Sequence, residues 1–156
     1  MSIIDRYSAD FWEVWQEDDF IIYYQKDWVN LEPSFPIIKF QAEVPEDFEY
    51  YASVNVVVDV RNDNLPEEEY ISSVKDNLGK FITGLDNLTI NRNTDEHFVF
   101  HEISYTSNQE GFLIQHTQYL WLICNKAITL SFVCGLDAVS DFAKTKALIF
   151  NTFQIK

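Results

Sequence analysis

The feature that most limits the fold is a change of hydrophobic period between residues 53 and 82. Residues 53–61 alternate strictly, with valine at positions 54, 56, 58 and 60, which is typical of a strand with one buried face. From residue 65 the apolar side chains recur at the spacing of one helix face: Leu65, Tyr70, Val74, Leu78, Phe81 and Ile82. The chain therefore contains a sheet and an amphipathic helix that covers it.

The ends of this helix are marked as well. Pro66 and the acidic run 67–69 fill the expected first turn, where a missing N–H is harmless and carboxylates meet the positive end of the helix dipole. Gly84 is a suitable stop at the other end. We therefore expect a helix between Asn64 and Gly84.

Further strands precede and follow this unit. Segments rich in β-branched and aromatic residues predict strands at 20–24, 37–42, 87–92, 97–106, 111–124 and 127–134. Turns at 107–111 and at 125–126 join the last three of them as antiparallel hairpins. A second helix is expected after Asp137 as N-cap, with a partial apolar stripe, and 153–155 is expected to form a closing edge strand.

The order of these elements predicts an α+β fold in which an antiparallel β-sheet is flanked by helices. Because the helices do not alternate regularly with the strands, a doubly wound, nucleotide-binding fold is excluded. No repeat, low-complexity tract or flexible linker interrupts the sequence, so we expect one domain over residues 1–156.

The N-terminal segment carries aromatic residues at helical spacing. Phe11, Trp12 and Trp15 suit one face of a short helix over residues 8–17, with Ser8 as its N-cap. Such a helix would either pack on its own sheet or present its aromatic rings to a partner.

Charge narrows the classes of function. The net charge is −14, and most of it lies in residues 1–20, with six acids and one base, and in residues 41–70, with nine acids and one base. Binding to nucleic acid or to anionic membranes requires clustered basic residues, so both are disfavoured.

The aromatic residues overlap these acidic stretches, because thirteen of the 25 fall within residues 1–51. We therefore expect one acidic, aromatic face that binds a basic protein partner. Four aromatic residues would supply its apolar anchors, and five carboxylates would set its electrostatic preference. The anchors are Trp12, Trp15, Tyr50 and Tyr51, and the carboxylates are Asp47, Glu49, Asp63, Glu67 and Glu68.

No motif for catalysis or cofactor binding is present. The sequence has no nucleophile elbow, no phosphate-binding glycine loop and no zinc-type cysteine spacing, so we expect a non-enzymatic protein without a cofactor or a metal site. One alternative of a different class is a small metal- or carboxylate-dependent hydrolase built on His101 and His116, which would face each other if the hairpin register allowed it.

Compartment and redox state follow from the first residues and the cysteines. The chain begins without the basic and apolar regions of a secretory signal, so we expect a cytoplasmic protein. Cys124 is expected opposite Ala127 and Cys134 opposite Thr117, too far apart for a disulfide, so both are expected to be buried thiols.

Five segments follow one another in the order of a known superfamily: 20–28, 54–58, 65–70, 113–119 and 150–155. The first is similar to its "P-x-x-W" entry strand, the fourth to its "Q-x-x-Y" strand and the last to its "i-x-S-F-x-i" closing segment. On these segments the chain resembles the PsbP-like superfamily, which also holds the DcrB-like proteins, the Ran-binding Mog-type proteins and the Eag-type chaperones of type VI secretion effectors. Gln25 departs from the usual proline, 96–98 from a small Gly-Arg-Ala-type segment, and residues 1–19 form an aromatic, acidic extension.

The resemblance implies an α/β/α-type sandwich that binds another protein, with no shared set of catalytic residues. Two related alternatives remain. An effector chaperone of the Eag type would hold an apolar helix in a groove of its sheet. A homodimer would pair through an exposed strand face or a sheet edge.

Overall fold

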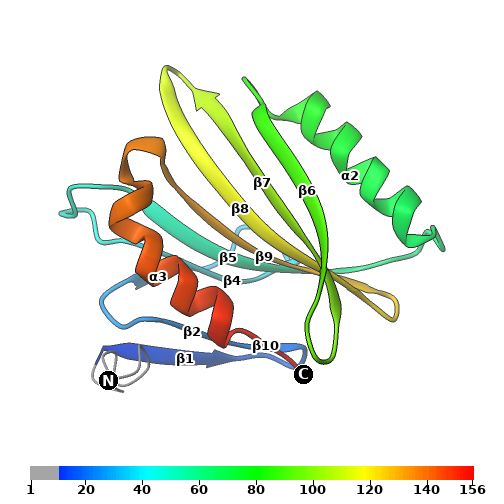
Figure 1. The fold of residues 1–156 in the computed structure, drawn as a ribbon. Coiled ribbons are helices and arrows are strands. Elements are labelled where there is room, and N and C mark those ends of the chain that lie inside the picture. Colours follow the sequence, from blue (N-terminus) through cyan, green and yellow to red (C-terminus); the bar gives the residue numbers. More distant parts are fainter. Residues whose placement is uncertain (1–10) are drawn as a thin grey trace.

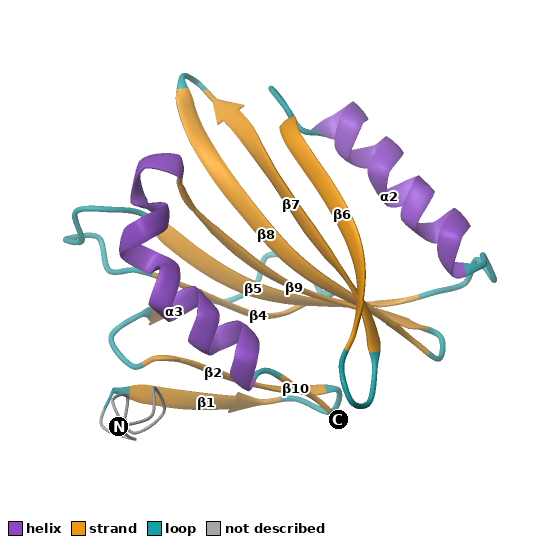
Figure 2. Ribbon diagram, in the orientation of Figure 1, coloured by secondary structure: helices purple, strands orange, loops and turns teal. Residues whose placement is uncertain are grey.

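The computed structural model describes residues 11–156, which form two antiparallel sheets and two long helices (Figures 1 and 2). The larger sheet has the strand order β3-β4-β5-β9-β8-β7-β6, and the smaller has the order β1-β2-β10. The elements are β1 (Trp12–Gln16), β2 (Phe20–Gln25), β3 (Val29–Asn30), β4 (Ile38–Glu43), β5 (Ala52–Val60), α2 (Glu67–Phe81), β6 (Asp86–Thr94), β7 (Val99–Gln109), β8 (Phe112–Ile123), β9 (Lys126–Gly135), the 3₁₀ turn η1 (Leu136–Ala138), α3 (Val139–Thr152) and β10 (Gln154–Ile155).

The elements stack in three layers. Figure 1 shows α3 and the small sheet on one face of the large sheet, and α3 contacts both β9 and β2. Helix α2 packs on the other face. The main core fills the space on the α3 side, where β5 places Val54 and Val56 opposite Phe132 and Leu130 of β9. A second apolar cluster lies between α2 and the opposite face, around Ile103 and Leu120. The predicted α+β class, with helices on both faces of an antiparallel sheet, is confirmed.

The strand and the helix that the change of hydrophobic period predicts are both present, with similar bounds. The alternating segment forms β5, whose residues are buried at every second position up to Val58. The helix runs from Glu67 to Phe81, with Pro66 at the N-cap position. Gly84 lies three residues beyond the helix and adopts a positive φ of 65° in the turn that leads to β6.

The N-terminal segment is a strand, so the predicted helix is wrong for the described residues, and Ser8 lies outside them. Trp12–Gln16 forms β1, which pairs antiparallel with β2 through a tight turn in which the Glu17 N–H donates to the Phe20 carbonyl. The spacings of one, three and four residues between the aromatic rings suit a helix. Strand β2, which is rich in β-branched and aromatic residues, offers a pairing partner, and this tertiary contact favours a strand over a helix. From Trp12 onward the segment is therefore part of the small sheet.

Three predicted boundaries also move. The β7–β8 turn consists only of Glu110 and Gly111, and the β8–β9 turn consists of Cys124 and Asn125. Asp137 lies inside η1, so Ala138 takes the N-cap position of α3.

Candidate partner-binding groove

Three loops at one end of the large sheet enclose an open groove of about 1030 Å³. Its walls are residues 49–51 of the β4–β5 loop, 109–114 around the β7–β8 turn, and 135–138 between β9 and α3. We call this surface the loop groove. The volume of the loop groove is at the upper end of the roughly 300–1000 Å³ of pockets that hold drug-sized ligands, so the groove has room for several side chains of a partner.

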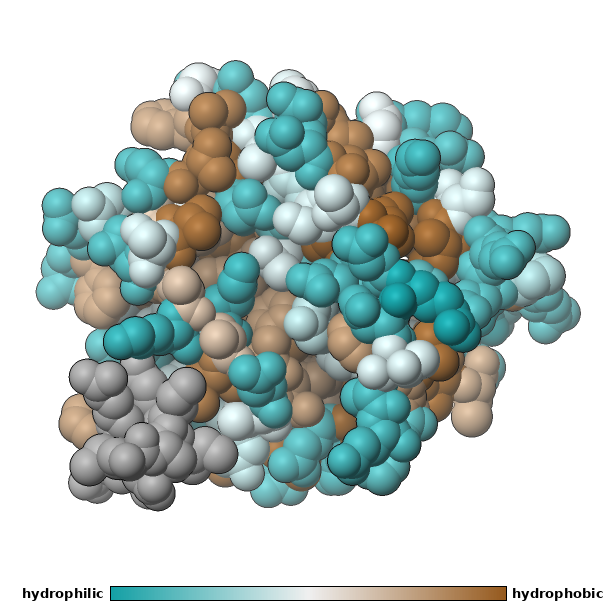
Figure 3. Space-filling model, viewed as in Figure 1, coloured by the Kyte–Doolittle hydropathy of each residue, from teal (hydrophilic) through white to brown (hydrophobic). Residues whose placement is uncertain are grey.

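Large apolar side chains stand exposed around the loop groove. Their exposed fractions are 73% for Phe112, 51% for Leu113, 51% for Tyr51 and 40% for Leu136. Figure 3 shows apolar side chains among polar ones at the upper left, where Figure 1 places the β7–β8 turn and the beginning of α3. A single exposed apolar residue is ordinary, but several that gather around one depression mark an interaction surface.

Local backbone chemistry fixes the β7–β8 wall. Glu110 and Gly111 both adopt positive φ, 55° and 92°, as the tight turn of a two-residue hairpin requires. The Asn108 side-chain oxygen accepts a hydrogen bond from the Gly111 N–H at 2.9 Å, and the Asn108 N–H donates to the Thr83 carbonyl. The turn is thus attached to the α2–β6 connection, and these hydrogen bonds hold the backbone that leads into Phe112.

Hydrogen bonds also hold the β4–β5 loop, which forms another wall of the loop groove. The Val44 N–H donates to the Ala52 carbonyl at the base of the loop, and the Phe48 N–H donates to the Pro45 carbonyl within it. The Tyr51 hydroxyl donates to the Glu43 carboxylate at 3.3 Å. Tyr50 packs against the main core.

Negative charge surrounds the Tyr50 phenol. The carboxylates of Glu49, Asp141 and Asp137, in that order of effect, raise the pKa of Tyr50. Of the described residues that line the loop groove, three are carboxylates and none is a base: Glu49, Glu110 and Asp137. The loop groove therefore combines apolar surface with an unneutralised negative field, which attracts a cationic ligand.

The predicted partner-binding residues divide into three groups. Glu49, Tyr50 and Tyr51 line the loop groove, and Asp47 lies in the same loop. The structure brings these four together as predicted, but whether they bind a partner stays a prediction.

The burial of Trp12 corrects its expected role as a surface anchor, whereas Trp15 is half-buried. Trp12 is only 8% exposed and belongs to the main core. Trp15 packs its ring 5.7 Å from that of Phe40, and its indole N–H donates to Glu17. Trp12 lies in the main core and Trp15 packs against it, so they do not form a free helix face, and whether Trp15 binds a partner stays a prediction.

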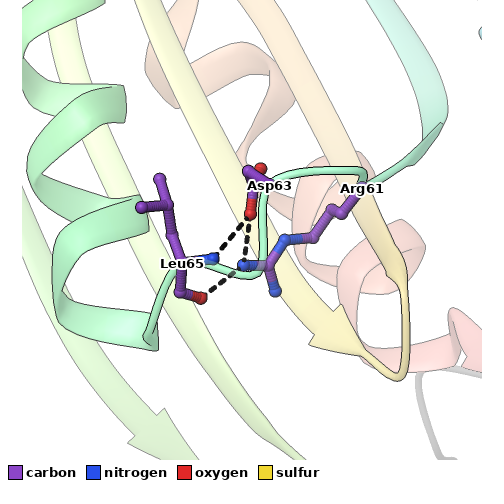
Figure 4. Close-up of polar contacts among 3 residues, drawn as sticks. All are labelled: Arg61, Asp63 and Leu65. Atoms are coloured by element: carbon purple, nitrogen blue, oxygen red, sulfur yellow. Dashed lines mark hydrogen bonds and ion pairs between the residues drawn. The ribbon is translucent and has the colours of Figure 1, made fainter.

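Asp63, Glu67 and Glu68 lie at the other end of β5, so the expected single acidic face is divided. The nine residues of β5 lie between the loop groove and this second acidic region. At the rise of an extended strand, the two ends of β5 are about 26 Å apart. Figure 4 shows that Asp63 has an internal role: its carboxylate accepts from the Leu65 N–H at 3.0 Å and from Arg61 at 3.0 Å. These contacts, the Leu65 N–H first, lower the pKa of Asp63.

Glu67 is also engaged within the protein. Its carboxylate lies 3.2 Å from Arg92 Nε and 3.3 Å from His101 Nε2, at the place where α2 begins on the sheet. Asp63 and Glu67 in this second acidic region are therefore each paired with an arginine of the protein itself.

The alternative arrangement in which His101 faces His116 is contradicted by the register of the hairpin. His101 lies opposite Leu120 and His116 lies opposite Tyr105, so the two imidazoles are four positions apart along the ladder. No group of three or more metal-ligating side chains occurs among residues 11–156. His116 instead stacks on Tyr105 and makes a 2.8 Å hydrogen bond with Ser107, whose 2% exposure keeps substrates from its hydroxyl.

The cysteines agree with the prediction in part. Neither forms a disulfide, and Cys134 is buried, which raises the pKa of its thiol. Cys124 is exposed, contrary to the expectation, because it occupies the β8–β9 turn with φ at 55°.

Sequence reasoning missed most of the loop groove. Phe112, Leu113, Leu136 and Asp137 come from two loops far from residues 49–51 in the sequence. One signal was available, since Glu110-Gly111 is followed directly by two large apolar residues at the end of a hairpin. In the described part of the chain, no helix has the length and apolar character needed to cross a membrane.

Comparison of the sequence with protein-family models gives no match, and no curated protein matches it. Solved structures do match. The cyanobacterial PsbP protein (CyanoP) of Synechocystis is similar over 96% of this chain and 95% of its own, with a TM-score of 0.70 and 8% identity.

Two further structures show the same similarity. PA94 of Pseudomonas aeruginosa, a protein of unknown function named as a candidate regulator, has a TM-score of 0.66 and 12% identity over 90% of this chain and 94% of its own. LpqN of Mycobacterium tuberculosis, involved in cell envelope biogenesis, has a TM-score of 0.66 and 13% identity over 88% and 83%.

The protein therefore has a PsbP-like fold, and the resemblance found in its sequence is confirmed at the level of the fold. At 8 to 13% identity, these similarities concern architecture alone.

Proposed function

We propose that this PsbP-like protein is a non-enzymatic interaction protein that binds a basic protein partner in the loop groove. The observation that carries the proposal is the combination of exposed apolar side chains with lining carboxylates and no lining base among the described residues. A catalytic site would need a nucleophile or an acid–base pair in a shielded cleft, whereas this surface is open and its titratable groups are carboxylates and two tyrosines.

The two kinds of side chain have different tasks in this proposal. Phe112, Tyr51 and Leu136 supply affinity, since large apolar anchors that become buried dominate binding energy. Glu49 and Asp137 increase the association rate and select against acidic proteins. The three similar structures do not share one stated role, so the partner has to be identified for this protein itself.

The test is affinity capture from native cells at low ionic strength, using the wild-type protein, Phe112→Ser and Phe81→Ser. Phe81 is 78% exposed on α2, outside the loop groove, so its variant removes a similar exposed ring elsewhere. We expect a basic protein that is captured by the wild type and by Phe81→Ser and is lost with Phe112→Ser. Equal capture by all three would place the binding surface elsewhere and refute the proposal.

A further inference from the structure

We propose that the loop groove receives one arginine side chain of the partner, held beside Tyr50 by the Asp137 carboxylate, with an apolar neighbour of that arginine packed on Phe112. This inference rests on the proposed function and deepens it, because it names the chemical group that the partner inserts.

The Asp137 carboxylate lies directly over Gly135 at the end of β9. A Cβ atom added to Gly135 would lie 2.7 Å from Asp137 Oδ1, closer than any real contact of that kind. The backbone of Gly135 has φ −59° and ψ 144°, a conformation that any residue adopts. Space for the carboxylate, not backbone freedom, is therefore what glycine provides here, and it lets the carboxylate lie back over the strand end.

Three carboxylates from separate elements converge near Tyr50. Glu49 belongs to the β4–β5 loop, Asp137 to η1 and Asp141 to the first turn of α3. All three raise the pKa of the Tyr50 phenol, with Glu49 having the largest effect. A cation bound beside Tyr50 would be attracted by all three carboxylates.

Arginine fits this surface better than lysine. A guanidinium is planar, stacks on aromatic rings and binds a carboxylate through two parallel hydrogen bonds, whereas an ammonium is a compact, strongly hydrated charge. Tyr50 and Tyr51 offer aromatic rings and Asp137 offers the carboxylate within the same walls. In the second acidic region, by contrast, Asp63 and Glu67 already form ion pairs with Arg61 and Arg92.

The experiment is an NMR titration of the whole protein with three tripeptide amides, acetyl-Leu-Arg-Phe, acetyl-Leu-Lys-Phe and acetyl-Leu-citrulline-Phe. Citrulline keeps the shape of arginine but has no charge. We expect the arginine peptide to shift the amide signals of residues 49–51 and 135–138. It should bind about tenfold more tightly than the citrulline peptide, the size of a charge-assisted pair, and about threefold more tightly than the lysine peptide.

Matched charge variants locate the site. Asp137→Asn is expected to weaken arginine-peptide binding about five- to tenfold, and Glu68→Gln, which removes one charge at the far end of β5, less than about twofold. Equal binding of the arginine and citrulline peptides would overturn the inference, as would equal effects of the two variants or no binding at several millimolar peptide.

These outcomes can be separated from failure of the proposed function. If the partner captured from cells depends on Phe112 but the peptides show no preference for arginine, the loop groove binds its partner without the arginine contact. If capture does not depend on Phe112, the proposed function itself fails.

Discussion

Phe20 of β2 stacks on Phe153, the residue that follows α3, with ring centroids 5.6 Å apart and an angle of 21° between the rings. Phe153 also stacks on Trp121 of β8 at 5.2 Å, so these rings join the small sheet to the large one. Phe20 is completely buried. Side-chain packing, not strand pairing between the sheets, therefore attaches the small sheet, and this stack is one part of it beside the contacts of Trp15 and Tyr24 with Phe40.

Replacing Phe20 with alanine should lower the free energy of unfolding by about 3–5 kcal/mol, because the cavity that remains cannot close fully. Urea denaturation measures this change. Phe81→Ala is the matched control, since that ring is exposed, and it should change stability by less than about 0.5 kcal/mol. A loss below about 1 kcal/mol for Phe20→Ala would show that the small sheet contributes little to the common core.

The long helices and strands of this fold could be predicted from the sequence, because the hydrophobic period of a long segment indicates which of its faces is buried. The valine alternation of β5 and the helical spacing of α2 each extend over enough residues to exclude the other structure. Trp12–Gln16 is too short for that, and its structure depends on pairing with β2, which local spacing does not reveal.

The loop groove could be predicted only in part, for a different reason. Glu49, Tyr50 and Tyr51 are adjacent in sequence and acidic or aromatic, so composition identified them. Asp63 and Glu67 have the same composition, but the length of β5 carries them away and Arg61 and Arg92 pair with them. Phe112 and Asp137 join the groove only through the register of β8 and β9, which fixes where their loops meet.

Gly135→Ala should displace the Asp137 carboxylate without changing the charge of the protein. The added Cβ would meet Oδ1 at 2.7 Å, and the side chain of Asp137 has to rotate away. We expect about threefold weaker binding of the arginine peptide with the fold unchanged, as judged by NMR. Gly79→Ala is the control, since a Cβ there meets nothing within 4 Å, and it should stabilise α2 by up to about 1 kcal/mol. Unchanged peptide affinity in Gly135→Ala would show that the carboxylate position does not matter.

Gly84→Ala should be more destabilising than Gly111→Ala. Both glycines have positive φ, 65° and 92°, so alanine at either site costs about 1–2 kcal/mol in backbone strain. Only at Gly84 does the new Cβ also approach Asn108 Cβ, at 2.7 Å, and Asn108 supports the β7–β8 turn. Thermal unfolding compares the two variants, and amide shifts at 109–113 should appear for Gly84→Ala as well. Equal midpoints would mean that the contact with Asn108 adjusts without cost.

Acidification should destabilise the protein through His116. Burial lowers the pKa of His116 in the folded protein below its usual value, so below about pH 6.5 the unfolded chain binds more protons than the folded one. The free energy of unfolding therefore falls as the pH decreases from about 6.5 through the lower, folded pKa. Burial also lowers the pKa of His101, so His101 contributes to the pH dependence with the same sign.

His116→Gln separates this contribution from the effect of the many carboxylates. Glutamine can still bond to Ser107, which lies 2.8 Å from His116 Nε2, but it does not titrate. The difference in unfolding free energy between wild type and variant, measured at several pH values in urea, should change in favour of the variant as the pH falls from 7 toward 5. A constant difference over this range would show that His116 has no part in the pH dependence.

Association with the captured partner should depend on salt through the loop groove. Glu49→Gln combined with Asp137→Asn should lower the association rate at low ionic strength about tenfold and leave the dissociation rate less affected, because charges at the rim of an interface act mainly on diffusional encounter. The same variant should flatten the dependence of that rate on salt concentration, which stopped-flow measurements report. Glu68→Gln combined with Glu69→Gln removes two charges at the start of α2, beyond β5, and should change the rate much less. Equal slopes for the two double variants would mean that the −14 charge of the whole protein, and not the loop groove, steers the partner.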